Sequence, residues 1–424
     1  MPNSQDDVTK LANSLRNKFE KLHPLSDECF IYKVPQRLRQ LNEGLYTPKV
    51  VSIGPLHHGR EELKAMEEIK IRYLRDFLQR TKAPMEEFLK YIKERETKLR
   101  KCYAESIELQ SAEFVEMIFL DSVFLIEFSL RIHHQRNTGE DRIFTKPWMK
   151  KDVRDDLFLL ENQLPLFIIK DLFELAKSKM QNDKPYEGVS MRELVLDLWE
   201  DLCINLFTEK SLEQHFDGAR HFVDLIRLCL QPSELGQSGE VKTIVTPTIT
   251  QLLQAGVKFK VGSVNSLFDI KFNHGTLEIP KLTIDDRTEA LFRNLEDFEA
   301  LNYGIKYYVN DYITIMSYLV NSPKDVEVLV EKGIIENFLP GSEEVSTMFR
   351  NLAKENKIDN SDFSYVGFIE DLNARCRSSW HHWEAALIQD HFNTPWASIS
   401  IGYAVVILLL SFIQTIIAIR SSLP

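Results

Sequence analysis

Two short polar stretches contain the residues best suited to chemistry. Glu161 lies in LENQLP, and His57 and His58 lie in GPLHHG. A buried carboxyl group with a raised pKa could serve as a general base, and a histidine could share that role. A carboxylate at a helix junction more often caps a helix or cross-links two segments. The sequence leaves both roles open for Glu161.

The sequence gives little support for a metal site or for a common catalytic motif. His57 and His58 are adjacent on a tight turn and therefore point in different directions, and the sequence has no HxH or HExxH motif. His391 follows His381 and His382 by more than two helical turns. The sequence also lacks GxSxG, GxxxxGK[ST] and GxGxxG. We therefore assign no catalytic, cofactor-binding or metal-ligating residue.

Composition narrows the class of protein. The 424 residues have a net charge of −11, which argues against nucleic acid as a partner. The five cysteines are widely and irregularly spaced without a CxxC pair, which argues against a disulfide framework or a structural zinc site. They are Cys29, Cys102, Cys203, Cys229 and Cys376.

One stretch, Ser111 to Arg131, is apolar at nearly every angle of a helical wheel, which predicts a core helix. Glu113, Glu116 and Glu127 project within one narrow arc, so all three can face water. Asp121 falls outside that arc and must be paired if it is buried.

Proline interrupts the second core stretch, Asp155 to Met180. Pro165 has no backbone donor and disfavours α geometry at Leu164, which predicts two helices that meet there. Pro165 then lies near the first turn of the second helix. Glu161 is expected at this junction, beside unpaired backbone groups.

The remaining pattern predicts a mainly α fold with a small β-hairpin or sheet insertion, of the α+β class. Period-two alternation marks a β-rich part at about residues 256–284, with His274-Gly275 as a hairpin turn. The polar residues 232–245 are the best candidate for a mobile loop. We expect a helical extension over residues 1–26 and one globular domain over residues 27–396.

The stretch from Ala397 to Ile419 has 23 residues and no charge. As a helix it would cover roughly 35 Å, enough for one bilayer crossing. Trp396 and Arg420 suit the two edges of a membrane. This predicts a single transmembrane helix in contact with lipid, followed by a short tail at residues 420–424. A buried core helix is the alternative.

The expected topology follows from the N-terminus, which has frequent charges and no apolar signal region. It is a tail-anchored, single-pass protein with a cytosolic body, at the plasma membrane or an endomembrane. An internal signal-anchor that translocates the body is the competing topology, because the flanking charge bias is slight. Ser400 and Ala404 form a small-xxx-small pair, which fits a homodimer or chance occurrence.

Several long motifs, in order, carry a resemblance to a known family. The chain closely resembles the plant family called "domain of unknown function 247" from about Asp27 to its C-terminal end. The motifs are IYKVPQRLR, LYTPKVVSIGPLHHG, DLFLLENQLPLF, LLQAGVKFK, LFDIKFNHGTLEIP, NYGIKYYVNDYITIMSYLV and DVEVLVEKGIIENFL. Where that family commonly has an acid followed by Gly-Cys-Phe, this chain has Asp121-Ser122-Val123-Phe124. A role for that cysteine therefore does not transfer.

The resemblance implies a helical plant protein with a C-terminal membrane segment and a function in recognition and signalling. We therefore expect a membrane-anchored, non-enzymatic recognition or signalling protein with a protein partner and no cofactor. The alternative is an unrecognised hydrolase or transferase with a site near Glu161 and His57. A purely architectural role at a membrane contact site is a third hypothesis.

Overall fold

The computed structural model describes most of the chain. It covers residues 4–20, 29–40, 42–134, 141–180, 188–199, 206–233, 246–262, 266–302, 306–354, 362–391, 406–407 and 409–414. Most of the predicted loop at residues 232–245, and both Ser400 and Ala404, lie outside this part. The predicted domain boundaries stay a prediction.

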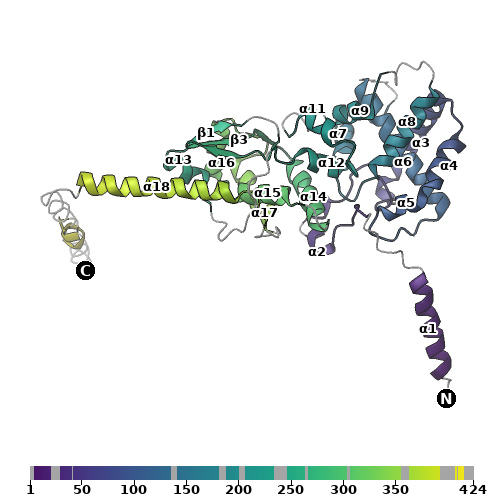
Figure 1. The fold of residues 1–424 in the computed structure, drawn as a ribbon, viewed down its shortest axis with the longest axis horizontal. Helices are drawn as coiled ribbons and strands as arrows, with labels where there is room; N and C mark the ends of the chain where they lie inside the picture. Colours follow the sequence, from purple (N-terminus) through teal and green to yellow (C-terminus); the bar gives the residue numbers. More distant parts are fainter. Residues whose placement is uncertain are drawn as a thin grey trace, which may run out of the picture.

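In the first half of the chain, several helices pack around one central helix, α6 (Figure 1). Helices α3, α4, α8 and α9 all pack directly on α6. The helices of this half are α1 (Ser4–Glu20), α2 (Gln36–Arg39), α3 (Lys64–Thr81), α4 (Met85–Glu94), α5 (Glu96–Lys101), α6 (Ser111–His133), α7 (Pro147–Asp156), α8 (Leu166–Lys179), α9 (Met191–Leu198), α11 (Glu209–His215) and α12 (Phe222–Cys229), with the 3-10 helices η1 (Glu43–Leu45) and η2 (Glu61–Leu63).

The second half combines helices with short strands. Helices α14, α15 and α17 pack on one another, and α14 also packs on α12 of the first half. The elements are α13 (Ile249–Gln254), β1 (Lys258–Val261), β2 (Lys271–Asn273), β3 (Thr276–Ile279), β4 (Leu282–Ile284), α14 (Thr288–Leu301), α15 (Tyr308–Leu319), α16 (Pro323–Glu331), β5 (Ile335–Asn337), α17 (Ser342–Ala353) and α18 (Val366–His391).

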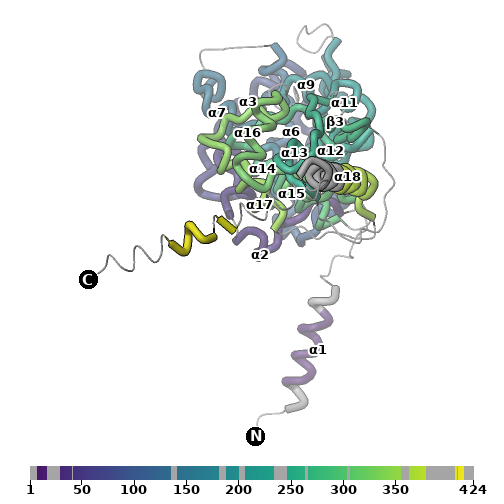
Figure 2. Tube along the Cα trace, turned by 90° about the vertical axis from the view of Figure 1, so that its left-hand side faces the viewer, coloured from purple at the N-terminus to yellow at the C-terminus, as the bar shows by residue number. Residues whose placement is uncertain are grey.

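Two helices extend from this body. Helix α18 begins beside α13 and β2 and runs outward from the end that contains the strands (Figure 1). Figure 2 looks nearly along its axis. Helix α1 lies apart from the body in both views.

Helix α6 is the predicted core helix, and its burial follows from its composition. Apolar side chains surround it, so a neighbour can pack on every side. The expected pairing of Asp121 is confirmed: its carboxylate accepts a hydrogen bond from Lys70 on α3. The interpretation that Glu127 can face water is wrong, because its carboxylate is fully buried against the guanidinium of Arg80.

Two small sheets form the β part. Strand β3 pairs with β2 antiparallel and with β1 parallel, while β4 pairs with β5 parallel. The predicted hairpin turn is confirmed between β2 and β3. His274 and Gly275 both have positive φ, 49° and 76°, as a tight two-residue hairpin turn requires. The mainly helical architecture with small sheets agrees with the predicted body.

The structure contradicts the predicted transmembrane helix over Ala397–Ile419. Within the described residues, no helix has both the length and the apolar character needed to cross a bilayer. A crossing takes about 20 consecutive residues, whereas the described helical run at residues 409–414 covers roughly 9 Å. The other positions of this segment, apart from residues 406–407, lie outside the described residues. The predicted single-pass, tail-anchored localisation is corrected with it.

Candidate functional site

The junction around Glu161 is irregular over a longer stretch than predicted. Helix α8 begins directly after Pro165, as expected from the fixed φ and missing donor of proline. Helix α7, however, already ends at Asp156. The prediction that the first helix continues to Pro165 is wrong, because the polar side chains between the helices bind another part of the backbone.

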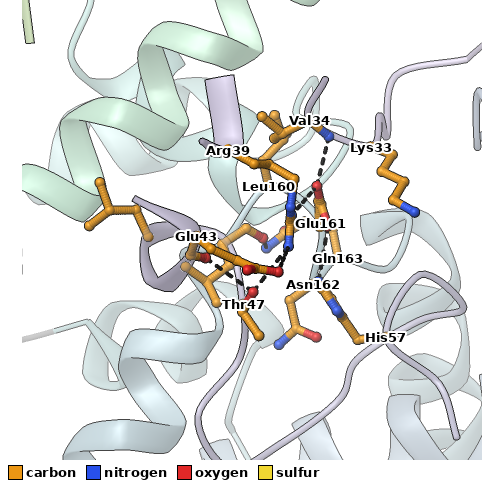
Figure 3. A network of polar contacts seen from close by, with 12 residues as sticks. Lys33, Val34, Arg39, Glu43, Thr47, His57, Leu160, Glu161, Asn162 and Gln163 are labelled. Atoms are coloured by element: carbon orange, nitrogen blue, oxygen red, sulfur yellow. Dashed lines mark hydrogen bonds and ion pairs between the residues drawn. The ribbon is translucent and has the colours of Figure 1, made fainter. Parts of the chain in front are cut away.

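That other part comprises residues 33–40 and 42–54, which we call the strap. Glu161 holds its beginning (Figure 3). One carboxylate oxygen, Oε1, accepts hydrogen bonds of 2.7 Å from the backbone N–H of Val34 and from Arg39. The other, Oε2, lies 3.1 Å from Nε2 of His57, although this contact lacks hydrogen-bond alignment. Arg39 also donates to the hydroxyl of Thr47. Glu161 therefore ties one end of the strap to the turn that contains His57.

Neighbouring side chains hold the rest of the strap. The carboxylate of Asp156 accepts hydrogen bonds of 2.8–2.9 Å from the backbone N–H groups of residues 49, 50 and 51. Asn162 accepts from the N–H of Ile53 and donates to the carbonyl of Val51. These bonds satisfy backbone groups that would otherwise be buried without a partner, in a segment that joins no sheet.

Gly54 ends the strap where only glycine fits. Its φ is +78°, and an added Cβ would lie 2.5 Å from the carbonyl oxygen of Gln163. Its N–H donates to Asp121, 2.7 Å away, and Asp121 also accepts from Lys70 at 2.5 Å. Lys70 donates in addition to the carbonyl of Ser52. This buried ion pair therefore fixes the end of the strap between α3 and α6.

These contacts give Glu161 and His57 a structural role. Both side chains are only 1% exposed. Burial would raise the pKa of Glu161, but the close contact with His57, the charge of Arg39 and the N–H of Val34 outweigh it and lower that pKa. A general base at neutral pH needs the opposite shift. The structure thus brings the two predicted residues together, but as an anchor for the strap.

The structure also reveals a site that the sequence analysis missed. A cavity of about 570 Å³ opens between α3, the C-terminal turn of α6 and residues 141–142. Five arginines line it: Arg72, Arg75, Arg80, Arg131 and Arg142. Glu68, Asp76 and Asp141 are the acidic residues of the lining, and Ala65, Ile69, Tyr73 and Gln79 complete it. We call this cavity the arginine cleft.

The floor of the arginine cleft is an ordered ion-pair network. Arg131 donates 2.7 Å hydrogen bonds to both Asp76 and Asp141, and its guanidinium lies 4.0 Å from the ring centroid of Tyr73. The hydroxyl of Tyr73 donates to Asp141. Burial and the carboxylate of Asp141 raise the pKa of Tyr73, so its hydroxyl stays neutral. The floor therefore holds one arginine between two carboxylates in fixed positions, with one negative charge in excess.

The rim of the arginine cleft has unmatched positive charge. Arg72 and Arg75 are 61% and 62% exposed, and Arg142 is exposed as well. Arg72 pairs with Glu68 at 2.6 Å, whereas Arg75 reaches Asp76 only at 3.3 Å. The five arginines of the whole lining exceed its three acids by two charges, and Glu127, which pairs with Arg80 from outside the lining, offsets one of them. On a chain with a net charge of −11, this remains a local excess of positive charge that favours an anion.

The sequence contained part of this signal. Arg72, Arg75, Asp76 and Gln79 recur at helical spacing of three or four, so they share one face of α3. Arg131 and Arg142, which complete the positive lining, lie far along the chain from α3, so their place in the cleft could be known only from the fold. In the described residues no group of three or more His, Cys, Asp and Glu side chains is arranged to hold a metal ion.

Comparison with known proteins agrees with the resemblance seen in the motifs. Residues 31–410 match the family described as plant protein of unknown function, "domain of unknown function 247". The chain belongs to this plant family. The match spans both halves of the body, so the strap, its anchor and the arginine cleft all lie in the family region.

Two proteins of Arabidopsis thaliana are similar to this member of the family. The UPF0481 protein At3g47200 is 28% identical, over 94% of this chain and 87% of its own length. The putative UPF0481 protein At3g02645 is 22% identical, over 98% of this chain and 95% of its own length. No solved structure matches the chain.

Proposed function

We propose that this protein is a non-enzymatic recognition protein that binds its ligand in the arginine cleft. The observation that carries the proposal is the contrast between the two polar sites. The cleft is open and has excess positive charge at its rim, whereas Glu161 and His57 are buried and committed to the strap. Binding sites are typically concave and present a few convergent polar groups.

The chemistry of the cleft favours binding over catalysis. Among the described residues, the lining includes no serine, threonine, cysteine, histidine or lysine, which are frequent nucleophiles and bases. The two acids of its floor, Asp76 and Asp141, are held by Arg131. A signalling role, as expected from the family resemblance, would follow if ligand binding changed the contacts of the protein with a partner.

Native mass spectrometry of the full chain purified from plant cells tests this proposal. We expect the wild-type protein to retain a bound small molecule, and the variant Arg72→Gln/Arg75→Gln/Arg142→Gln to lose it. Circular dichroism would establish that the variant is folded. Absence of a bound molecule in both proteins would argue against recognition in the cleft.

A second assay addresses the hydrolase or transferase alternative. The purified chain is incubated with generic carboxylic esters, phosphoesters and glycosides. We expect no turnover above that of the solvent blank. Turnover that disappears in a folded Glu161→Gln variant would overturn the non-enzymatic proposal.

A further inference from the structure

We propose that the ligand of the arginine cleft is a small, hydroxyl-rich molecule that carries at least two phosphate groups. This inference rests on the proposed function and adds the chemical class of the ligand. Three features of the cleft determine it: the charge of the rim, the polarity of the floor and the aromatic content of the lining.

The rim determines the charge of the ligand. Arg72, Arg75 and Arg142 place three positive charges at the rim, against Glu68, which pairs with Arg72, and Asp76, which Arg75 shares with Arg131. Guanidinium groups bind phosphate through parallel N–H···O bonds, which makes arginine well suited to phosphate recognition. Because three guanidinium groups surround the mouth, a ligand with two or more phosphates can contact them at the same time.

The floor determines the body of the ligand. The floor has one cation, Arg131, against two carboxylates, Asp76 and Asp141, so it would repel a deep anion. Asp76 is still 33% exposed and presents carboxylate oxygens, and Gln79 adds an amide. These groups accept hydrogen bonds from hydroxyl groups. The phosphates therefore lie at the rim, and the hydroxyls point to the floor.

The lining argues against an aromatic base as the body. The aromatic side chain among the described residues of the lining, Tyr73, is 3% exposed, and the guanidinium of Arg131 covers its ring. The described lining therefore offers no exposed aromatic ring, on which proteins often stack a base. A cavity of about 570 Å³ accommodates a phosphorylated sugar or cyclic polyol.

One residue makes the inference unusually testable. Glu68 pairs with Arg72 at 2.6 Å, so it would compete with a phosphate for the same guanidinium. Replacing Glu68 by glutamine removes this competitor and one negative charge from the rim. Glu68→Gln should therefore tighten binding, whereas loss of an arginine should weaken it. A purely structural role for the cleft predicts no such opposite pair of effects.

The experiment is isothermal titration calorimetry with the full chain. The probes are inositol hexakisphosphate, fructose 1,6-bisphosphate, inorganic phosphate, ATP, citrate and unphosphorylated fructose. We expect saturable binding of the two polyol and sugar phosphates, weaker binding of phosphate, ATP and citrate, and none of fructose. Binding should weaken as ionic strength rises, because the rim is exposed.

The variants sharpen the result. Arg72→Gln/Arg142→Gln should weaken binding at least tenfold, and Glu68→Gln should strengthen it severalfold. The matched control is Arg350→Gln on α17, an arginine of similar exposure, 50%, that also has an acidic neighbour, Glu343. It should leave binding unchanged.

Several outcomes would overturn the inference. They are no binding of any phosphorylated probe, equal binding by all variants, or tighter binding of ATP than of the sugar phosphates. Cleft-dependent binding only to an acidic peptide, or only to vesicles that display a phosphoinositide headgroup, would likewise overturn a free small molecule. If native mass spectrometry finds a cleft-dependent ligand without phosphate, this inference fails while the proposed function stands.

Discussion

Replacing Lys70 by methionine should be among the most damaging single changes to stability. Its ammonium group is fully buried and donates to Asp121, Glu67 and the carbonyl of Ser52, at 2.5–2.7 Å. Burial disfavours the charged form, but the carboxylates of Asp121 and Glu67 outweigh it and raise the pKa of Lys70. Methionine fills a similar volume but cannot donate.

The magnitude follows from what the substitution leaves behind. In Lys70→Met, Asp121 keeps one donor, the N–H of Gly54, and remains a buried carboxylate without its cation. Removing one partner of a buried ion pair typically costs about 3–5 kcal/mol. Asp121→Leu alone leaves the ammonium with Glu67 and the carbonyl of Ser52 as partners, so it should cost somewhat less. The double variant Lys70→Met/Asp121→Leu leaves no buried charge, so it should cost less than the sum of the two.

Equilibrium unfolding in urea, followed by circular dichroism and by fluorescence, measures these free energies. The matched control is Lys64→Met on the same helix, whose ion pair with Glu61 is exposed. An exposed pair contributes about 0–1 kcal/mol. A loss below about 1 kcal/mol in Lys70→Met, or a double variant that equals the sum of the single ones, would refute the reasoning.

Three further predictions concern the strap and its surroundings. Burial lowers the pKa of His221 to about 4. In the unfolded chain the same imidazole is protonated below about pH 6.5. The stabilising effect of neutral His221 is therefore complete above pH 6.5 and declines as the pH falls toward 4. The total is roughly 3 kcal/mol, so the stability difference between wild type and His221→Phe should shrink by that amount from pH 7 to pH 4, and a constant difference would contradict it. Gly54→Ala should lower the free energy of unfolding in urea by at least about 2 kcal/mol, because it adds both backbone strain at positive φ and a clash. The control is Gly59→Ala, where φ is +77° and no atom lies within 4 Å of an added Cβ, so this variant has the strain alone. Equal losses in the two variants would count against the clash. Glu161→Gln should destabilise by about 3 kcal/mol, because it leaves the buried Arg39 with only its 3.8 Å contact to the exposed Glu43 as an ion pair, and it should speed proteolysis of the strap. An unchanged digestion rate would speak against the anchor.

Helical periodicity in the sequence predicted which side chains of a single helix are buried. The burial of α6 followed from its apolar wheel, and the need of Asp121 for a partner followed from its position off the acidic arc. The partner itself, Lys70, lies 51 residues earlier and could not be inferred without the fold. Glu127 shows the limit of the wheel: its angle suggested solvent, but Arg80 of α3 covers it.

The irregular segments were the least predictable. Apart from the short helices α2 and η1, the strap forms no regular element, and neither does the stretch between Asp156 and Pro165, because side chains satisfy their backbone groups. Such pairing has no period in the sequence. For the same reason Glu161 attracted two interpretations, and the neighbouring arginine and histidine decided for the structural one. Of the arginine cleft, the sequence indicated only the residues on one face of α3.

The position of the strap also has a consequence for how the chain folds. The hydroxyl of Tyr46 donates to Asp297 on α14, 251 residues later, while Val34 binds Glu161, 127 residues later. Contacts across such long loops form slowly, because closure of the loop costs entropy before any contact forms. During synthesis the strap therefore emerges from the ribosome long before its binding partners exist. The N-terminal part of the body should be completed last, when α14 has been made, although its own residues are among the first to be translated.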